Sequence, residues 1–81
     1  GAVQGAHLLG VDVPSKVRIV GIDGISLGEA ISPRLTTLSL QTGRVAQEAA
    51  SILAELFATV PRTSSSINRA VRPVVVWRES A

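Results

Sequence analysis

Asp23 is the side chain of this sequence best placed to bind a ligand. It directly follows the apolar segment 17–22, which is typical of a strand, and Gly24 comes next. In open α/β sheets, ligands bind beyond the carboxyl ends of the strands, where loops and helix N-termini converge. A carboxylate there can accept two hydrogen bonds, from neighbouring sugar hydroxyls or from a pair of nucleobase N–H groups. The alternative interpretation is a turn carboxylate that caps the following helix.

Other polar side chains lack the partners that catalysis or metal binding requires. His7 is the only histidine and there is no cysteine, so no metal-ligand set is visible and His7 is expected to be an exposed helix residue. The serine run 64–66 has no histidine or acidic pattern near it, which argues against nucleophilic catalysis. We therefore expect no enzyme activity, no bound metal and no cofactor. Trp77 is expected to be a packing residue, with stacking on a ligand as the alternative.

A helix and a strand are predicted to lead up to Asp23. Residues 2–9 suit a short helix, and Gly10 suits the position just after it, where the backbone turns left-handed. The segment 17–22 is apolar and rich in β-branched residues, which favours a strand buried on both faces, as in parallel sheets.

A second helix and strand are predicted to follow the turn at Asp23. Ser26 is a suitable N-cap, and Glu29 three residues later completes a capping-box pattern. That short helix must end before Pro33, because the residue before a proline disfavours the helical conformation. Residues 35–38 are predicted to form the next strand.

The second half of the sequence continues the alternation. Residues 43–58 carry an apolar stripe at helical spacing, and the Pro- and Ser-containing segment 59–66 is predicted to be a surface loop. Two β-rich segments follow, at 67–71 and at 74–77. Strands alternating with helices predict an α/β fold with a mostly parallel sheet.

The composition excludes several classes of protein. The chain has 81 residues, of which 46% are hydrophobic and 17% are charged, so it is not a disordered tail. Its formal charge is only +2, and the arginines are dispersed rather than clustered, which argues against a phosphate-binding surface. No signal peptide is visible, and the apolar runs are too short to span a bilayer. The lack of cysteine excludes a disulfide scaffold and is compatible with the cytoplasm.

Four elements of the sequence together resemble one family of proteins. They are the Val13-Pro14 start, the Gly21-Ile22-Asp23 strand end, the Ser-Pro-x-Leu-Thr-Thr segment at 32–37 and the Arg-x-Ser ending at 78–80. Their order and spacing resemble the C-terminal part of the effector-binding domain of lactose- and galactose-repressor-type (LacI/GalR) transcriptional regulators. The resemblance covers nearly the whole chain, but only about the last quarter of such a regulator.

The resemblance implies the two-lobed fold of periplasmic sugar-binding proteins. Residues 1–40 would belong to the C-terminal lobe, residues 41–66 would form a crossover helix and loop, and residues 67–81 would supply terminal strands. It also implies a cytoplasmic regulator with a small, sugar-like effector molecule and no membrane partner. Operator DNA would be bound only through an N-terminal helix-turn-helix domain outside this segment.

The resemblance also implies which residues contact the effector. Asp23 matches the aspartate of a Gly-aromatic-Asp motif that touches the effector in well-known members, with Gly24 beside it. Thr42 stands near the position where some members stack an aromatic ring on the effector. Two departures weaken the match: Ile22 replaces the usual aromatic residue, and Leu40 replaces a usual glutamine. The identity of the effector therefore cannot be transferred from a relative.

Members of the family form dimers through the C-terminal lobe. Carried over position by position, the interface would include Val3, Gln4, His7, Leu27 and Ile31. For the apolar members of this set, the alternative is a place in the intramolecular core. A second candidate function is the sugar-binding component of an ABC-type transporter, which shares the fold.

Overall fold

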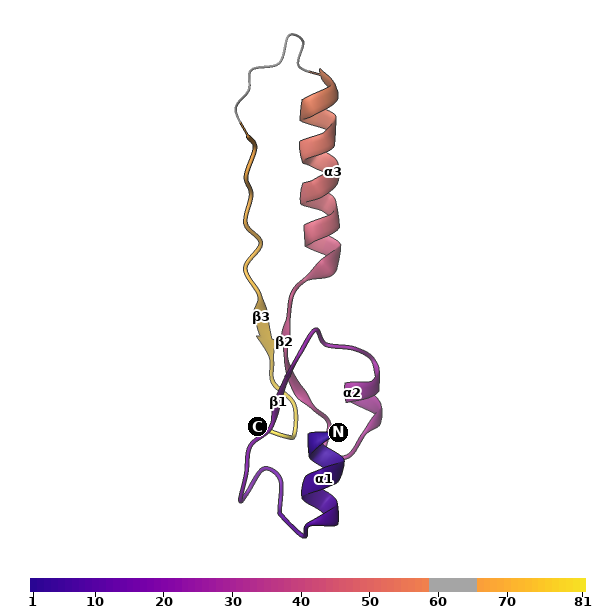
Figure 1. The fold of residues 1–81 in the computed structure, drawn as a ribbon, viewed down its shortest axis with the longest axis vertical. Helices are drawn as coiled ribbons and strands as arrows, with labels where there is room; N and C mark the ends of the chain where they lie inside the picture. Colours follow the sequence, from indigo (N-terminus) through magenta and orange to yellow (C-terminus); the bar gives the residue numbers. More distant parts are fainter. Residues whose placement is uncertain (59–65) are drawn as a thin grey trace. The chain divides into compact units, whose positions relative to one another are not determined.

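The computed structural model describes residues 1–58 and 66–81, and these form two units. Unit 1 contains Gly1–Leu40 and Pro73–Ala81, and unit 2 contains Gln41–Arg72. Figure 1 labels the helices and strands of both units. Asp23 and Gly24 lie in unit 1, and Thr42 lies in unit 2.

The first helix, α1 (Ala2–Leu8), ends as the sequence predicts. Gly10 has a φ of 68° and follows the C-cap residue. The N–H of Gly10 donates to the carbonyl of His7 at 3.1 Å, and the N–H of Val11 donates to the carbonyl of Ala6 at 2.9 Å. These two bonds form a Schellman motif, which satisfies the last carbonyls of the helix and turns the chain toward the sheet.

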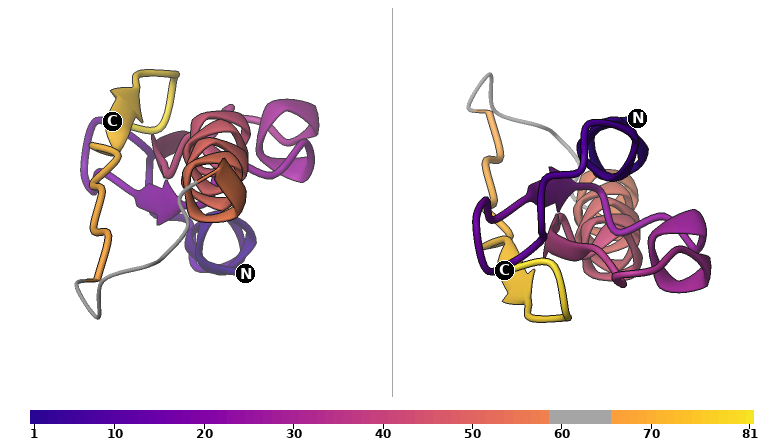
Figure 2. Two further views of the ribbon diagram at one scale, coloured as in Figure 1. Left: turned by 90° about the horizontal axis from the view of Figure 1, so that it is seen from above. Right: turned by 90° about the horizontal axis from the view of Figure 1, so that it is seen from below.

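Unit 1 is built on a three-stranded sheet in the order β1-β2-β3. The strands are β1 (Val20–Ile22), β2 (Thr36–Ser39) and β3 (Val74–Val76). β1 pairs with β2 in parallel, and β2 pairs with β3 in antiparallel orientation, so the sheet is mixed. In Figures 1 and 2, α1 and the short helix α2 (Leu27–Ala30) lie on the same side of the strands. The predicted α/β class is confirmed.

The prediction of a strand at 17–22 that is buried on both faces is wrong. Only Val20–Ile22 is a strand, and the side chains of Val20 and Ile22 are 57% and 66% exposed. β1 lies at an edge of the sheet, and the described residues do not cover its faces. Its apolar side chains are therefore available to other protein surface.

The predicted capping box at Ser26 is also wrong, although the helix forms. α2 starts after Ser26, whose side chain makes no capping bond. Ser26 itself has helical dihedrals (φ −58°, ψ −28°) rather than the extended ones of most N-caps, so its hydroxyl is not directed at the first turn. The carboxylate of Glu29 instead accepts a hydrogen bond from Arg78 at 2.9 Å. The helix ends before Pro33 as predicted, since Ile31 is already extended.

Unit 2 contains the long helix α3 (Thr42–Ala58), which begins one residue earlier than predicted. The predicted strand at 67–71 is wrong, because residues 66–73 form neither helix nor strand. Arg69 of this segment contacts α3: its guanidinium donates to Glu48 at 3.2 Å, to Ser51 at 3.1 Å and to Glu55. The predicted loop at 59–66 lies outside the described residues except for its last residue.

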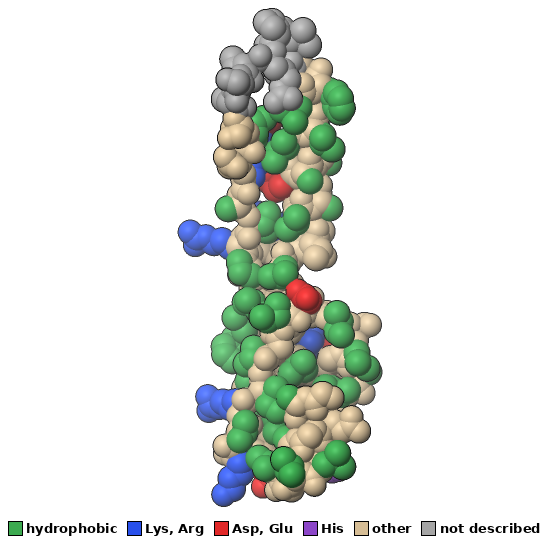
Figure 3. Space-filling view, viewed as in Figure 1, with side chains coloured by type: hydrophobic (Ala, Val, Ile, Leu, Met, Phe, Trp, Pro, Cys, Tyr) green, Lys and Arg blue, Asp and Glu red, His purple; other side chains and the backbone are tan. Residues whose placement is uncertain are grey.

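The buried side chains of the described residues are polar. None of the hydrophobic residues in 1–58 and 66–81 is buried, whereas Thr36 and Ser80 are fully buried and Thr37 is 2% exposed. Figure 3 shows hydrophobic side chains spread over the visible surface. Trp77 is 72% exposed, so the prediction that it packs inside this chain is wrong. Hydrogen bonds, rather than an apolar core, therefore join the described parts of unit 1.

Candidate functional site

The candidate site is the turn formed by Asp23 and Gly24 at the carboxyl end of β1. Both residues have left-handed backbones, with φ values of 84° and 64°. Asp tolerates this conformation better than most residues, and glycine adopts it without steric cost. The N–H of Asp23 donates to the carbonyl of Leu38 at 2.9 Å, and the N–H of Gly24 donates to Oγ1 of Thr37 at 3.0 Å. Two hydrogen bonds to β2 thus hold the turn.

The carboxylate of Asp23 is exposed and available to a ligand. Within residues 1–58 and 66–81, it takes part in no hydrogen bond or ion pair. It does not cap α2, whose N-cap is Ser26. Both oxygens of this carboxylate can therefore accept hydrogen bonds from hydroxyl or N–H groups of a ligand.

At the amino ends of β1 and β2, the C-terminal tail is joined to β2 by a buried hydrogen-bond network of Thr36, Ser80 and Ile19. The N–H of Thr36 donates to Oγ of Ser80 at 2.9 Å, and that hydroxyl donates to the carbonyl of Ile19 at 2.6 Å. The N–H of Ile19 returns a bond to the carbonyl of Ser80 at 2.9 Å. We call these three residues the tail network. It connects the last turn of the chain to β2 and to the residue that precedes β1.

Two charged residues of the tail extend this attachment. The N–H of Arg78 donates to Oγ1 of Thr36 at 2.8 Å, and its guanidinium donates to the carbonyl of Leu35 and to Glu29, both at 2.9 Å. The carboxylate of Glu79 accepts bonds from the backbone N–H and from Nε of Arg34, at 3.0 and 2.9 Å. The backbone and side-chain hydrogen bonds from Arg34 lower the pKa of Glu79 below its ordinary value of 4.5.

The Arg69 cluster of unit 2 is also charge-assisted. The hydrogen bonds that Arg69 donates to Glu55 and then to Glu48 raise the pKa of Arg69, since both carboxylates favour the charged guanidinium. Arg69 is cationic at every physiological pH in any case, so these contacts hold the segment against α3 without a titration step.

The residues expected to contact an effector are divided between the two units. Asp23 and Gly24 form one turn, whereas Thr42 is the first residue of α3 in unit 2, where its side chain is exposed. The contact of any of the three with an effector stays a prediction.

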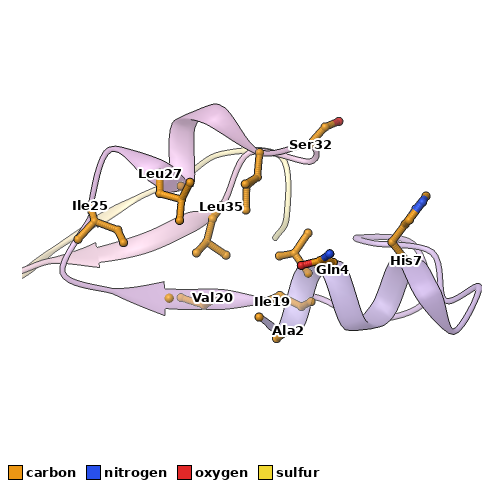
Figure 4. Close-up of a pocket in the computed structure, with 14 residues that line it drawn as sticks. Ala2, Gln4, His7, Ile19, Val20, Ile25, Leu27, Ser32 and Leu35 are labelled. Atoms are coloured by element: carbon orange, nitrogen blue, oxygen red, sulfur yellow. The ribbon is translucent and has the colours of Figure 1, made fainter.

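The five residues expected at a dimer interface all line one open cavity of unit 1. It has a volume of about 690 Å³, and α1, β1 and α2 surround it (Figure 4). Its lining includes Val3, Gln4, His7, Leu27 and Ile31. Leu27 is 62% exposed, so this set does not form an intramolecular core among the described residues. A burial against another protein surface stays a prediction.

Sequence reasoning missed the roles of Thr36, Thr37 and Ser80. All three belong to the Ser-Pro-x-Leu-Thr-Thr and Arg-x-Ser elements, which were used only to find the resemblance. The available signal was the presence of small hydroxyl side chains within two short motifs. Such side chains can pair with backbone groups of distant segments, but the sequence does not reveal which segments.

The described residues offer neither a metal site nor a membrane span. Among them, no group of three or more His, Cys, Asp or Glu side chains could hold a metal ion. No helix in the described part of the chain is long and apolar enough to cross a membrane. In that part, Ser66 accepts a hydrogen bond from Asn68 at 3.3 Å, while Ser64 and Ser65 lie outside it.

Comparison with known proteins identifies the fold. The family described as periplasmic binding protein-like domain matches residues 1–81. A crystal structure of a LacI family transcriptional regulator from Arthrobacter sp. FB24, in complex with lactose, is similar with a TM-score of 0.83 and 32% identity. The match covers 96% of this chain and 30% of that protein. A LacI family transcriptional regulator from Mycobacterium smegmatis is similar with a TM-score of 0.70 and 30% identity, over 99% of this chain and 28% of that protein.

A curated relative points the same way. The ribose operon repressor of Halalkalibacterium halodurans is 47% identical over 38 residues, which is 47% of this chain and 12% of that protein. The chain thus spans less than a third of the length of the relatives it matches. The resemblance to LacI/GalR-type regulators is confirmed by these matches.

Proposed function

The chain belongs to the periplasmic binding protein-like domain family, and on that premise we propose that it is an effector-sensing and dimerisation segment of a cytoplasmic transcriptional regulator. The effector is a small sugar-like molecule. A longer protein containing this segment binds the effector and, through a separate domain, operator DNA. Effector binding changes its affinity for the operator, which is a coupling between two sites.

The observation that carries this proposal is the exposed Asp23 carboxylate at the carboxyl end of β1. A lactose complex is known for a relative with a TM-score of 0.83, and a second relative is a ribose operon repressor. Neighbouring hydroxyls of such sugars can donate to the two oxygens of one carboxylate. Gly24 allows a ligand to approach the backbone closely at the same turn, and Thr42 is proposed as a further contact.

The open cavity of unit 1 supports the dimerisation part of the proposal. Its lining combines apolar side chains with Gln4 and His7, which is the mixed character of many protein interfaces. A second copy of the same surface would remove Leu27 and Ile31 from water. An interface around a two-fold axis uses the same patch on both subunits, so a single patch is sufficient.

The charge distribution supports a separate site for DNA. The chain carries a formal charge of only +2, and no basic cluster is present in its sequence. Regulation of transcription by this segment would therefore be indirect. No enzyme activity is proposed for it.

Two titrations test the proposal on the full-length protein that carries this segment. Calorimetry with lactose and with D-ribose measures effector binding, and a gel shift with its operator measures the coupling. Asp23→Ala is expected to weaken the binding of the sugar by about 1.5–3 kcal/mol, the range for hydrogen bonds to charged groups. Asp12→Ala, another exposed carboxylate of unit 1, is the matched control and should leave the affinity unchanged. Equal affinities of wild type and Asp23→Ala would contradict the assignment.

Sedimentation equilibrium tests dimerisation in the same protein. Leu27→Glu places a charge in the cavity and should shift the protein toward monomer. Ala30→Glu adds the same charge to the same helix outside the cavity lining, and it should remain dimeric. A sugar-binding protein that is monomeric and has no operator would instead support the second candidate, a component of a transporter.

A further inference from the structure

Thr37 makes the hydrogen bond that distinguishes the Asp23–Gly24 turn from an ordinary surface turn. Its side chain is 2% exposed, and its Oγ1 accepts the N–H of Gly24 at 3.0 Å. Gly24 lies 13 residues away in the sequence, so this bond joins two separate segments. Thr37 is also paired with Gly21 in the parallel register of β1 and β2.

The turn depends on this bond because its backbone is unusual. Asp23 has a φ of 84°, which a non-glycine residue adopts only where the surroundings hold it. The N–H of Gly24 is part-buried and would lose its partner if Oγ1 were removed. The remaining backbone bond, from Asp23 to Leu38, fixes only one end of the turn. Without Thr37 the carboxylate of Asp23 would sample several directions.

The neighbouring threonine has a different partner. Thr36 accepts the N–H of Arg78 through its Oγ1 and donates its own N–H to Ser80, so both of these hydrogen bonds join it to the C-terminal tail. The two adjacent threonines therefore have different roles: Thr36 attaches the C-terminal tail to β2, and Thr37 stabilises the Asp23–Gly24 turn. This difference provides a matched pair of variants with the same change in chemistry.

We propose that Thr37 is a positioning residue for the effector site: through Gly24 it fixes the direction in which Asp23 presents its carboxylate to the hydroxyls of a sugar. This rests on the proposed function, because it takes Asp23 as an effector contact. Thr37 does not touch the effector. Thr37 stabilises, before the sugar binds, the conformation that the Asp23–Gly24 turn has in the bound state. Binding therefore requires less loss of conformational freedom in the turn.

The test compares three variants of the full-length protein, with lactose and D-ribose as the probes. Thr37→Val keeps the shape and removes the acceptor, Thr37→Ser keeps the acceptor, and Thr36→Val changes the tail contact alone. Two quantities are measured: the affinity by calorimetry, and the hydrogen-exchange rate of the Gly24 amide. The melting temperature of each variant shows whether it is folded.

Thr37→Val is expected to weaken sugar binding about 10-fold and to accelerate exchange at Gly24 about 10-fold or more, as expected for one lost hydrogen bond. Thr37→Ser should restore both within about 2-fold, because it retains the acceptor. Thr36→Val should lower the melting temperature while leaving the affinity and the Gly24 exchange near those of wild type. Unchanged affinity in folded Thr37→Val would overturn the proposal. Equal loss of affinity in both valine variants would also overturn it, since that would indicate a general loss of structure.

Asp23→Ala separates this proposal from the one on which it rests. If Asp23→Ala leaves affinity intact, or if neither sugar binds the wild type, the effector assignment of the turn fails. The positioning role then fails with it, whereas the Gly24 exchange in Thr37→Val still decides whether the bond holds the turn. If Asp23→Ala weakens binding and Thr37→Val does not, only the inference about Thr37 is wrong.

Discussion

In units 1 and 2, segments that are distant in the sequence are held together by different kinds of contact. In unit 1 the C-terminal tail is attached through Thr36 and Ser80, which are fully buried. In unit 2 the segment after the described end of α3 is attached through Arg69, whose ion-pair partners are 38% and 48% exposed. A buried hydrogen bond is costly to break because water cannot reach the polar group that is left without a partner. When a surface ion pair is broken, water solvates both charged groups, so the cost is small. A lost contact therefore has a larger effect on stability in unit 1 than in unit 2.

Ser80→Ala should have the largest effect on stability. It removes the acceptor of the Thr36 N–H and the donor to the Ile19 carbonyl. Leaving buried groups unpaired should reduce the free energy of unfolding by roughly 2–4 kcal/mol. Urea unfolding of the full-length protein, followed by circular dichroism, measures it. Ser26→Ala is the control and should change little, because that side chain makes no capping bond. If the two alanine variants reduced the free energy of unfolding by similar amounts, the buried hydroxyl of Ser80 would contribute no more than the hydroxyl of Ser26, contrary to the expectation.

Arg78→Gln should have the next largest effect. The Arg78 side chain is 13% exposed and donates to the Leu35 carbonyl and to Glu29. Its loss should cost about 1–2 kcal/mol, since the part-buried carbonyl of Leu35 loses a charged donor. Arg18→Gln, an exposed arginine of the same unit, is the matched control in the same urea experiment. A change no larger than that of Arg18→Gln would show that the guanidinium of Arg78 does not help to hold the tail.

Arg69→Gln should shift the urea midpoint less than Arg78→Gln does. Its contacts with Glu48, Ser51 and Glu55 are exposed, so water and salt compensate for them. The small shift should diminish between about 0.1 M and about 1 M salt as screening shortens to a few ångströms. Arg72→Gln serves as the control because Arg72 accepts a hydrogen bond from Gln41 through its backbone carbonyl, which the substitution keeps. If Arg69→Gln shifted the urea midpoint more than Arg78→Gln does, the contacts of unit 2 would contribute more to stability than those of unit 1, contrary to the expectation.

Glu79→Gln should have the smallest effect, and it should depend on pH. Hydrogen bonds from Arg34 lower the pKa of Glu79 in the folded protein. A lowered carboxyl pKa stabilises the fold above the unfolded value, and this contribution is lost as the pH falls through the folded pKa. Wild type and Glu79→Gln should therefore differ slightly at neutral pH and converge in acid, in urea midpoints measured across that range. If the difference in urea midpoint between wild type and Glu79→Gln grew in acid, the pKa of Glu79 would not be lowered in the folded protein.

The sequence was informative where the signal was local and uninformative where a distant segment decided the outcome. Gly10 predicted the end of α1, and the apolar stripe of 43–58 predicted α3 within one residue, because caps and helical periodicity involve nearby residues. The capping box at Ser26 failed because Glu29 is paired with Arg78, which lies 49 residues away. The strand at 17–22 was predicted too long and too buried, since burial depends on surfaces that a local pattern does not contain.

The candidate site shows the same limit. The position of Asp23 after an apolar run was sufficient to predict a carboxylate at the carboxyl end of a strand. The hydrogen bond from Gly24 to Thr37 could not be predicted, because it depends on the register of β1 and β2. Thr36, Thr37 and Ser80 belong to motifs that indicated the family, and their hydrogen bonds hold the C-terminal tail and the Asp23–Gly24 turn.

A crystal structure of the full-length protein with lactose or D-ribose bound would test the central claim most directly. The account predicts that a carboxylate oxygen of Asp23 lies about 2.5–3.0 Å from a sugar hydroxyl, as in a charge-assisted hydrogen bond, while the N–H of Gly24 still donates to Thr37. A sugar bound elsewhere in the protein, with the Asp23 carboxylate directed into solvent, would contradict it.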